Sequence, residues 1–145
     1  EDVARFAGSL HAHELRVQDR VTFTGEVPDE DLPGYYRAAD LFVLPANARA
    51  EAFGMVLLEA MASQLPCVTT EVGSGTSWVV QDGRTGLVVP PRDPQALAQA
   101  IRTLFADPQR RQAMGRAGRA RVEAEFTLDK MVARVQAVYE ALLEA

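Results

Sequence analysis

Short runs that resemble strands alternate with helical segments along most of this chain, and this alternation constrains the fold more than any other feature. Runs of three to five mainly apolar residues occur at 21–24, 41–44, 66–70 and 87–89. Continuous apolar runs are typical of strands covered on both faces, and their alternation with helices is typical of a parallel sheet. With 145 residues, 48% of them hydrophobic, the chain can bury one ordinary core. The sequence therefore predicts an α/β fold, a Rossmann-like parallel sheet flanked by helices, in one domain over residues 1–145.

Apolar spacing and cap residues predict helical segments around those strands. They cover residues 2–15, 28–39, 54–63, 77–81, 94–106, 108–125 and 128–143. The last segment carries an apolar stripe of Met131, Val135, Val138 and Leu142, which packs either on its own domain or on a further one. Because the chain opens within a helix and shows only four strands, we expect its first strands to be missing. A small, self-contained domain is the alternative.

Charge and cysteine content narrow the function. Twenty acidic residues against fifteen basic ones give a net charge of −5, whereas nucleic-acid binding needs clustered Lys and Arg. The arginines of 110–121 alternate with Glu123 and Glu125, which indicates a solvated helix face rather than a binding patch. The single Cys67 cannot form an internal disulfide and fits a reducing compartment. We therefore expect a cytoplasmic protein that binds no nucleic acid.

The segment 49–63 holds the residues with the clearest chemistry. Its helix is apolar on nearly every side, so we expect it to be buried, and Glu59 then needs a hydrogen-bond partner in the fold or in a ligand. Glu51 lies eight positions earlier, roughly 12 Å away at the helical rise per residue. Free backbone N–H groups of the first helical turn lie between them, and the helix dipole favours an anion there. These N–H groups belong to Phe53, Gly54, Met55 and Val56.

This order of carboxylate, anion site and carboxylate matches the hydroxyls, pyrophosphate and ribose diol of a nucleotide-diphosphate sugar. The spacing is too long for two carboxylates that act on one bond. On spacing alone a second interpretation stays open, in which Glu59 caps or pairs with a neighbouring loop and Glu51 is only a surface acid. Other nucleotide motifs are incomplete in the sequence, because Gly73 and Gly75 lack the third glycine of a dinucleotide fingerprint.

Residues 51–59, followed by AMA at 60–62, resemble the E-x7-E signature of the glycogen-synthase-like retaining glycosyltransferases (family four, GT-B architecture). The resemblance covers most of the chain in order. Its further segments are VTFTG at 21–25, YYRAAD at 35–40, VLP at 43–45, LPCV at 65–68 and DGRTGLVV at 82–89. It implies that this chain is the C-terminal, donor-binding domain of a GT-B enzyme.

The resemblance also implies six substrate-binding residues, which are Glu51, Phe53, Gly54, Met55, Val56 and Glu59. Of these, Glu51 and the first two N–H groups hold the donor sugar, the next two N–H groups face the diphosphate, and Glu59 accepts both ribose hydroxyls. The donor is a UDP-, GDP- or ADP-sugar. The family needs no cofactor and no metal, so we expect none here, and the sequence has only two histidines.

Two departures from the family pattern stand out. A Gly-Gly-x-x-Glu pattern usually follows the third of these strands, whereas residues 73–78 read GSGTSW, without an acid. The family's Arg and Lys, which neutralise charge on the leaving diphosphate, fall before the point where this chain starts. We therefore assign no catalytic residue to the chain and expect it to be inactive alone.

The resemblance suggests partners and rivals as well. The expected partners are the nucleotide-sugar donor and a missing N-terminal acceptor domain, with a peripheral membrane contact of the whole protein as a further candidate. In such domains a lost first strand would lie between two remaining strands, and the exposed edges would favour a homodimer. One alternative is a phosphorylase or sucrose-synthase-like enzyme. The other is a non-catalytic sugar-nucleotide-binding or assembly module. For the pathway, the resemblance suggests bacterial cell-surface polysaccharide or glycolipid synthesis.

Overall fold

The structure is a computed structural model that describes residues 2–143, with side chains described from residue 8 onward. The chain divides into two units, one ending at Gly34 and one beginning at Tyr35. The first unit holds α1 (Asp2–Glu14) and the 3-10 helix η1 (Gln18–Arg20). The second unit holds the sheet and the whole segment 49–63. The single domain over residues 1–145 stays a prediction.

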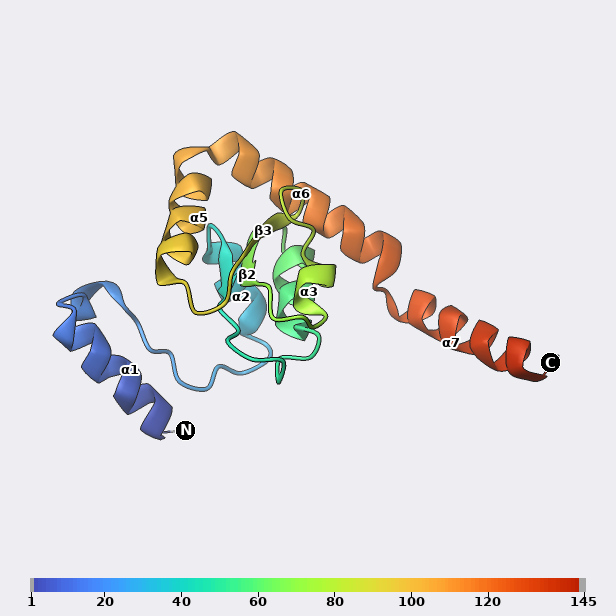
Figure 1. Cartoon of the computed structure of the whole chain (residues 1–145), viewed down its shortest axis with the longest axis horizontal. Helices are drawn as coiled ribbons and strands as arrows, with labels where there is room; N and C mark the ends of the chain where they lie inside the picture. The colour runs from blue at the N-terminus through green and yellow to red at the C-terminus, as the bar shows by residue number, and fades with distance from the viewer. Residues whose placement is uncertain (1, 144–145) are drawn as a thin grey trace. The chain divides into compact units, whose positions relative to one another are not determined.

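Three parallel strands form the sheet of the second unit (Figure 1). They are β1 (Phe42–Leu44), β2 (Cys67–Thr70) and β3 (Gly86–Val89), paired in the order β1-β2-β3. Val43 lies opposite Val68 in the register, and Thr69 lies opposite Val88. Every residue of the central strand β2 is buried, as expected for a strand covered on both faces. The predicted α/β fold with an open parallel sheet is confirmed.

Helices cover both faces of this sheet. Successive residues of β2 point to opposite faces, and on each face they pack against a different helix. Cys67 lies in a core cluster with Leu57 of α3 (Met55–Ala62), whereas Val68 lies in a second cluster with Leu104 of α5 (Pro94–Ala106). Figure 1 shows α3 and α5 on opposite sides of the strands. The other helices of the chain are α2 (Leu32–Ala38), α4 (Thr76–Val79), α6 (Pro108–Glu125) and α7 (Leu128–Leu143).

Asp-Pro pairs define where α5 and α6 begin. The side chain of Asp93 accepts a hydrogen bond from the Ala96 N–H at 2.8 Å, and that of Asp107 accepts one from the Arg110 N–H at 2.9 Å. A proline follows each cap at the first helical position, where no N–H is needed. These local signals explain why the predicted bounds 94–106 and 108–125 are confirmed, as are those of 128–143.

The predicted strand at 21–24 is wrong, since these residues belong to no strand of the structure. Val21 has the extended backbone angles of a strand, but no neighbouring strand pairs with it. An extended segment becomes a strand only when its N–H and C=O groups join a ladder. The predicted gap among the remaining strands is also wrong for the sheet that forms, because β1, β2 and β3 pair directly with one another.

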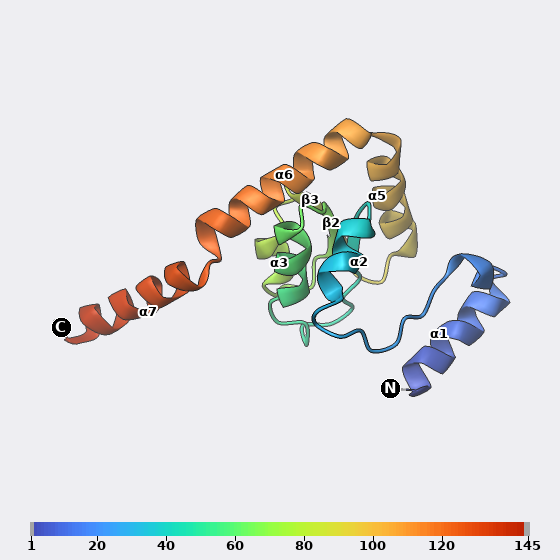
Figure 2. The same cartoon turned by 180° about the vertical axis from the view of Figure 1, so that it is seen from behind.

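The last helix, α7, has an exposed apolar stripe. Every described side chain of α7 is exposed, including those of Met131, Val135, Val138 and Leu142. Figure 2, the reverse view, shows α7 continuing from the end of α6 without a strand or another helix of its unit beside it. The prediction that this stripe packs on its own domain is therefore wrong, and the alternative of a further domain stays open. Within residues 2–143, no helix combines the length and the apolar character needed to cross a membrane.

Candidate functional site

Two loops meet at the edge of the sheet where parallel strands β1 and β2 end. One loop leads from Leu44 to α3, and the other leads from Thr70 to α4. The Gly75 N–H donates to the Ala52 carbonyl at 2.8 Å and joins the two loops. A Cβ on Gly75 would lie 2.9 Å from that carbonyl oxygen, so the close approach requires glycine. In open parallel sheets this edge is where ligands bind.

Gly54 starts α3 in a left-handed conformation, with φ of 81°. A Cβ at this position would meet Leu57 Cδ1 at 2.7 Å, so both backbone and space favour glycine. Its N–H donates to Glu51 Oε1 at 3.0 Å. The half-buried Glu51 carboxylate thus caps the start of α3, where the helix dipole favours negative charge. The interpretation of Glu51 as only a surface acid is wrong.

This cap corrects one part of the predicted anion site. Four N–H groups were expected to be free, but that of Gly54 already has a carboxylate partner. The N–H groups of Met55 and Val56 occupy the first two helical positions, which have no carbonyl partner in the helical pattern. Within the described part of the chain, the Phe53 N–H has no hydrogen-bond partner either. Three of the four predicted donors therefore remain available to a ligand.

Glu59 is exposed, which contradicts the prediction that its helix buries it. Helix α3 turns Leu57, Ala60 and Met61 into the core. Met55 and Glu59 stand one turn apart on the opposite side, and the Met55 side chain is 61% exposed. An almost wholly apolar sequence does not reveal which of its sides meets a neighbour. The result is an open face that runs from the start of α3 to Glu59.

The predicted partner of Glu59 is present, but it comes from a helix rather than a loop. The Tyr36 hydroxyl on α2 donates to Glu59 Oε2 at 2.8 Å. Burial, and then the hydrogen bond to Glu59 and its charge, raises the pKa of Tyr36 to about 12. The hydroxyl is therefore protonated and remains a donor at neutral pH.

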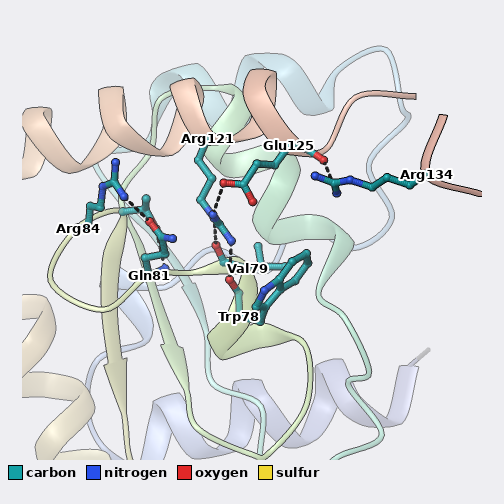
Figure 3. A network of polar contacts seen from close by, with 8 residues as sticks. Trp78, Val79, Gln81, Arg84, Arg121, Glu125 and Arg134 are labelled. Atoms are coloured by element: carbon teal, nitrogen blue, oxygen red, sulfur yellow. Dashed lines mark hydrogen bonds and ion pairs between the residues drawn. The ribbon is translucent and has the colours of Figure 1, made fainter. Parts of the chain in front are cut away.

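A cluster around Arg121 supports the Phe53 loop, and the sequence analysis missed it. Figure 3 shows its polar part, in which Arg121 reaches Glu125 and the carbonyls of Trp78 and Val79. The rings of Phe53, Trp78 and Phe126 have centroids 5.2 to 6.2 Å apart. The guanidinium of Arg121 lies 5.6 Å from the Trp78 centroid and 5.1 Å from that of Phe126. It also donates to the Trp78 carbonyl at 2.9 Å and to Glu125 at 2.6 Å.

Arg121 thus corrects the prediction of a solvated arginine face on α6. The residue is only 9% exposed, whereas Arg116 and Arg119 on the same helix are exposed. The 121/125 spacing of opposite charges is the same for a surface pair and a buried one, so the charge pattern alone could not distinguish them. The aromatic residues at 53, 78 and 126 were the only sequence signal that could have indicated a buried partner for Arg121.

Glu71, two residues before Gly73, places an acid beside the turn at 73–78. Glu71 Oε1 accepts the Gly73 N–H at 2.9 Å, and this bond, together with one from Ser77, holds the pKa of Glu71 below its usual value. Glu71 therefore stays ionised beside the loop junction. Among the side chains that the structure describes, from residue 8 to residue 143, no three of His, Cys, Asp or Glu gather in a way that could hold a metal ion.

A family model and the most similar relatives all match this chain to glycosyltransferases. The family model described as "Glycosyl transferases group 1" matches residues 6–121. D-rhamnosyltransferase WbpZ of Pseudomonas aeruginosa is 43% identical over 107 residues, which cover 74% of this chain and 28% of the relative. A GDP-mannose-dependent alpha-(1-6)-phosphatidylinositol monomannoside mannosyltransferase of Mycobacterium tuberculosis is 39% identical, covering 86% of this chain and 33% of the relative. The chain thus spans about a third of the length of these relatives.

Solved structures agree with the sequence matches. Sucrose-phosphate synthase of Thermosynechococcus elongatus superposes with a TM-score of 0.87 at 36% identity, covering 98% of this chain and 35% of that one. HepE of Anabaena, solved in complex with UDP-glucose, gives a TM-score of 0.80 at 28% identity, covering 98% and 38%. The C-terminal domain of a group 1 glycosyl transferase (LpcC) of Francisella tularensis gives 0.73 at 25% identity, covering 83% and 60%.

Proposed function

We propose, from the premise that this chain belongs to the glycosyl transferases group 1 family, that it is the donor-binding part of a retaining glycosyltransferase. In this proposal the whole protein moves a sugar from a nucleotide-diphosphate sugar to a glycan, lipid or small acceptor. The observation that carries it is the open face of α3, with backbone donors at its start and the exposed Glu59 carboxylate farther along.

The start of α3 suits the diphosphate. The N–H groups of Met55 and Val56 point out of the first turn without helical partners, and the helix dipole adds positive character there. The Glu51 carboxylate holds Gly54 with Oε1 and has Oε2 left to accept a hydroxyl of the donor sugar. Glu51 thus has a double role in this proposal, as a helix cap and as a sugar ligand beside the Phe53 N–H.

Glu59 suits the ribose. It follows Met55 by one helical turn, which is about 6 Å along the axis. Its ionised carboxylate accepts hydrogen bonds only, so it pairs with a diol, whose two hydroxyls donate. The diphosphate and the ribose would thus lie along the same exposed side of α3.

The relatives suggest which donors to test first. One is named for GDP-mannose, and one solved neighbour holds UDP-glucose. We therefore place GDP-mannose and UDP-glucose first within the predicted class of UDP-, GDP- or ADP-sugars. An acceptor on a bacterial glycolipid or surface polysaccharide accords with the named substrate of the first of these relatives.

The rest of the protein would complete the enzyme. The chain spans about a third of its relatives, so we propose an additional acceptor-binding domain and, with it, the cations that act on the leaving diphosphate. The exposed stripe on α7 would pack on that domain. Alone, the chain would bind donor without transferring sugar.

A homodimer through the outer edge of β1, and a peripheral membrane contact of the whole protein, are further parts of this proposal.

Saturation-transfer NMR on this chain tests the proposal, with UDP-glucose, GDP-mannose, UDP and GDP as ligands. Glu59→Ala should abolish the transfer signal. Glu123→Ala, which removes an exposed carboxylate paired only with Arg119, is the matched control and should retain it. Binding that survives Glu59→Ala would overturn the role of Glu59. No signal with any of the four ligands would count against donor binding by this chain.

A further inference from the structure

Tyr36 connects three elements next to the proposed ribose site. Its ring lies on α2, half-buried, with its centroid 5.9 Å from that of Phe42 at the start of β1. Both rings pack against the core cluster that contains Leu57. From this fixed base the hydroxyl reaches α3 and donates to Glu59 Oε2 at 2.8 Å. The ring is thus held by the core while its polar tip reaches the open face.

We propose that Tyr36 is a positioning residue for nucleotide recognition, which holds the Glu59 carboxylate in the orientation that accepts the two ribose hydroxyls. This inference rests on the proposed function, because it assigns a partner to the residue that would bind the ribose. Tyr36 itself does not contact the nucleotide in this proposal.

The hydrogen-bond inventory permits this arrangement. An ionised carboxylate offers about four lone-pair positions, two on each oxygen. Tyr36 occupies one of them on Oε2, so Oε1 and a second position on Oε2 stay open. Two hydroxyls of a diol fill these positions without displacing the tyrosine. The tyrosine bond and the ribose bonds are therefore compatible, and the first prepares the second.

Exposure explains why Glu59 needs such a partner. The side chain of a glutamate on an open helix face samples several rotamers, and a ligand that binds it must select one. A hydrogen bond from a ring that the core already holds restricts those rotamers before the ligand arrives. Less side-chain freedom is then lost on binding, which strengthens the complex.

The test compares ribonucleotides with their 2′-deoxy counterparts on purified wild-type chain and three variants. The probes are GDP against dGDP and UDP against dUDP, and the dissociation constants come from calorimetry. Tyr36→Phe removes only the hydroxyl. Tyr35→Phe is the matched control, because Tyr35 is the neighbouring residue on the same helix and is 54% exposed. Glu59→Gln reports the loss of the carboxylate itself.

We expect wild type and Tyr35→Phe to prefer the ribonucleotide. Tyr36→Phe should weaken ribonucleotide binding by roughly three- to tenfold, the range of one hydrogen bond, and should weaken the 2′-deoxynucleotide less, because only its 3′-hydroxyl is left to donate to Glu59. Thermal unfolding of the variants checks that the fold is retained.

The outcomes separate the inference from the proposed function. If wild type binds none of the probes, the proposed function fails for this chain, and the inference fails with it. If Glu59→Gln removes the ribose preference but Tyr36→Phe keeps it, the function stands and the inference is overturned. Equal weakening of both nucleotide types in Tyr36→Phe would also overturn it, since that result indicates a structural role alone.

Discussion

Helices α3 and α7 both have strongly apolar sequences, yet they differ in what surrounds them. The eight residues of α3 bury Leu57, Ala60 and Met61 in the core and leave a second side open for Met55 and Glu59. The sixteen residues of α7 have the regular stripe of a packed amphipathic helix, and none of them is buried. Apolar periodicity therefore specifies where a helix forms, whereas its neighbours determine which side is covered.

The largest expected effect tests this contrast directly. Leu57→Ala on α3 removes a fully buried side chain and should cost about 4 kcal/mol of unfolding free energy. Leu142→Ala on α7 removes a side chain that is 70% exposed, so it should change stability by less than about 0.5 kcal/mol. Urea unfolding of both variants measures the difference. Similar costs for the two would mean that α7 packs on something in solution.

The second effect extends the comparison to the helix between them. On α6, Arg121→Ala leaves the Trp78 and Val79 carbonyls without their partner and removes the cation above two rings. We expect a loss of about 2 to 3 kcal/mol in unfolding free energy. Arg116→Ala, at an exposed position of the same helix, should be nearly neutral. Equal denaturation midpoints would contradict the role of the cluster.

The third effect concerns the start of α3. Gly54→Ala forces a side chain into the left-handed region and towards Leu57, and should cost about 1 to 2 kcal/mol. Donor binding should weaken as well, because the first turn shifts. Gly34→Ala in α2 has no atom within 4 Å of the added Cβ, and alanine favours helix there, so stability should stay equal or rise slightly. Thermal melts and the NMR assay measure both effects, and a neutral Gly54→Ala would show that the turn can relax.

The smallest effect is a pH dependence from the turn beside α3. The pKa of Glu71 is lowered in the folded chain by the Gly73 N–H and Ser77. Its contribution to stability is therefore present above the ordinary carboxyl pKa of 4.5 and is lost as the pH falls through the lower folded value. The Tm difference between wild type and Glu71→Gln should be small and positive at pH 7 and should shrink as the pH falls below 4.5. A difference that grows on acidification would reverse the assignment.

Local chemistry explains which parts of the fold could be predicted from the sequence. Asp93 and Asp107, each followed by proline, specify the starts of α5 and α6 without any tertiary information. The strand at 21–24 failed because a strand depends on a partner that its own sequence does not contain. Three of the strands were predicted to within one residue, and each of them has a neighbouring strand to pair with.

For the candidate site, the sequence predicted which residues to examine but not their surroundings, and their binding roles stay predictions. The Glu51 and Glu59 spacing identified two carboxylates of interest, and both have specific hydrogen-bond partners. The partner of Glu59 lies 23 positions earlier in the chain, on another helix, so spacing could not reveal it. Arg121 was interpreted as exposed because its pairing with Glu125 follows the ordinary surface pattern.

The Arg121 cluster also gives the chain an optical property. Trp78 is its only tryptophan, it is 52% exposed, and its ring lies 6.1 Å from that of Phe53 in the loop that starts the site. Indole emission responds to the polarity and mobility of its surroundings. A ligand that orders this loop would therefore change the fluorescence of a single, native reporter, and the occupancy of the site could be followed in real time without a label.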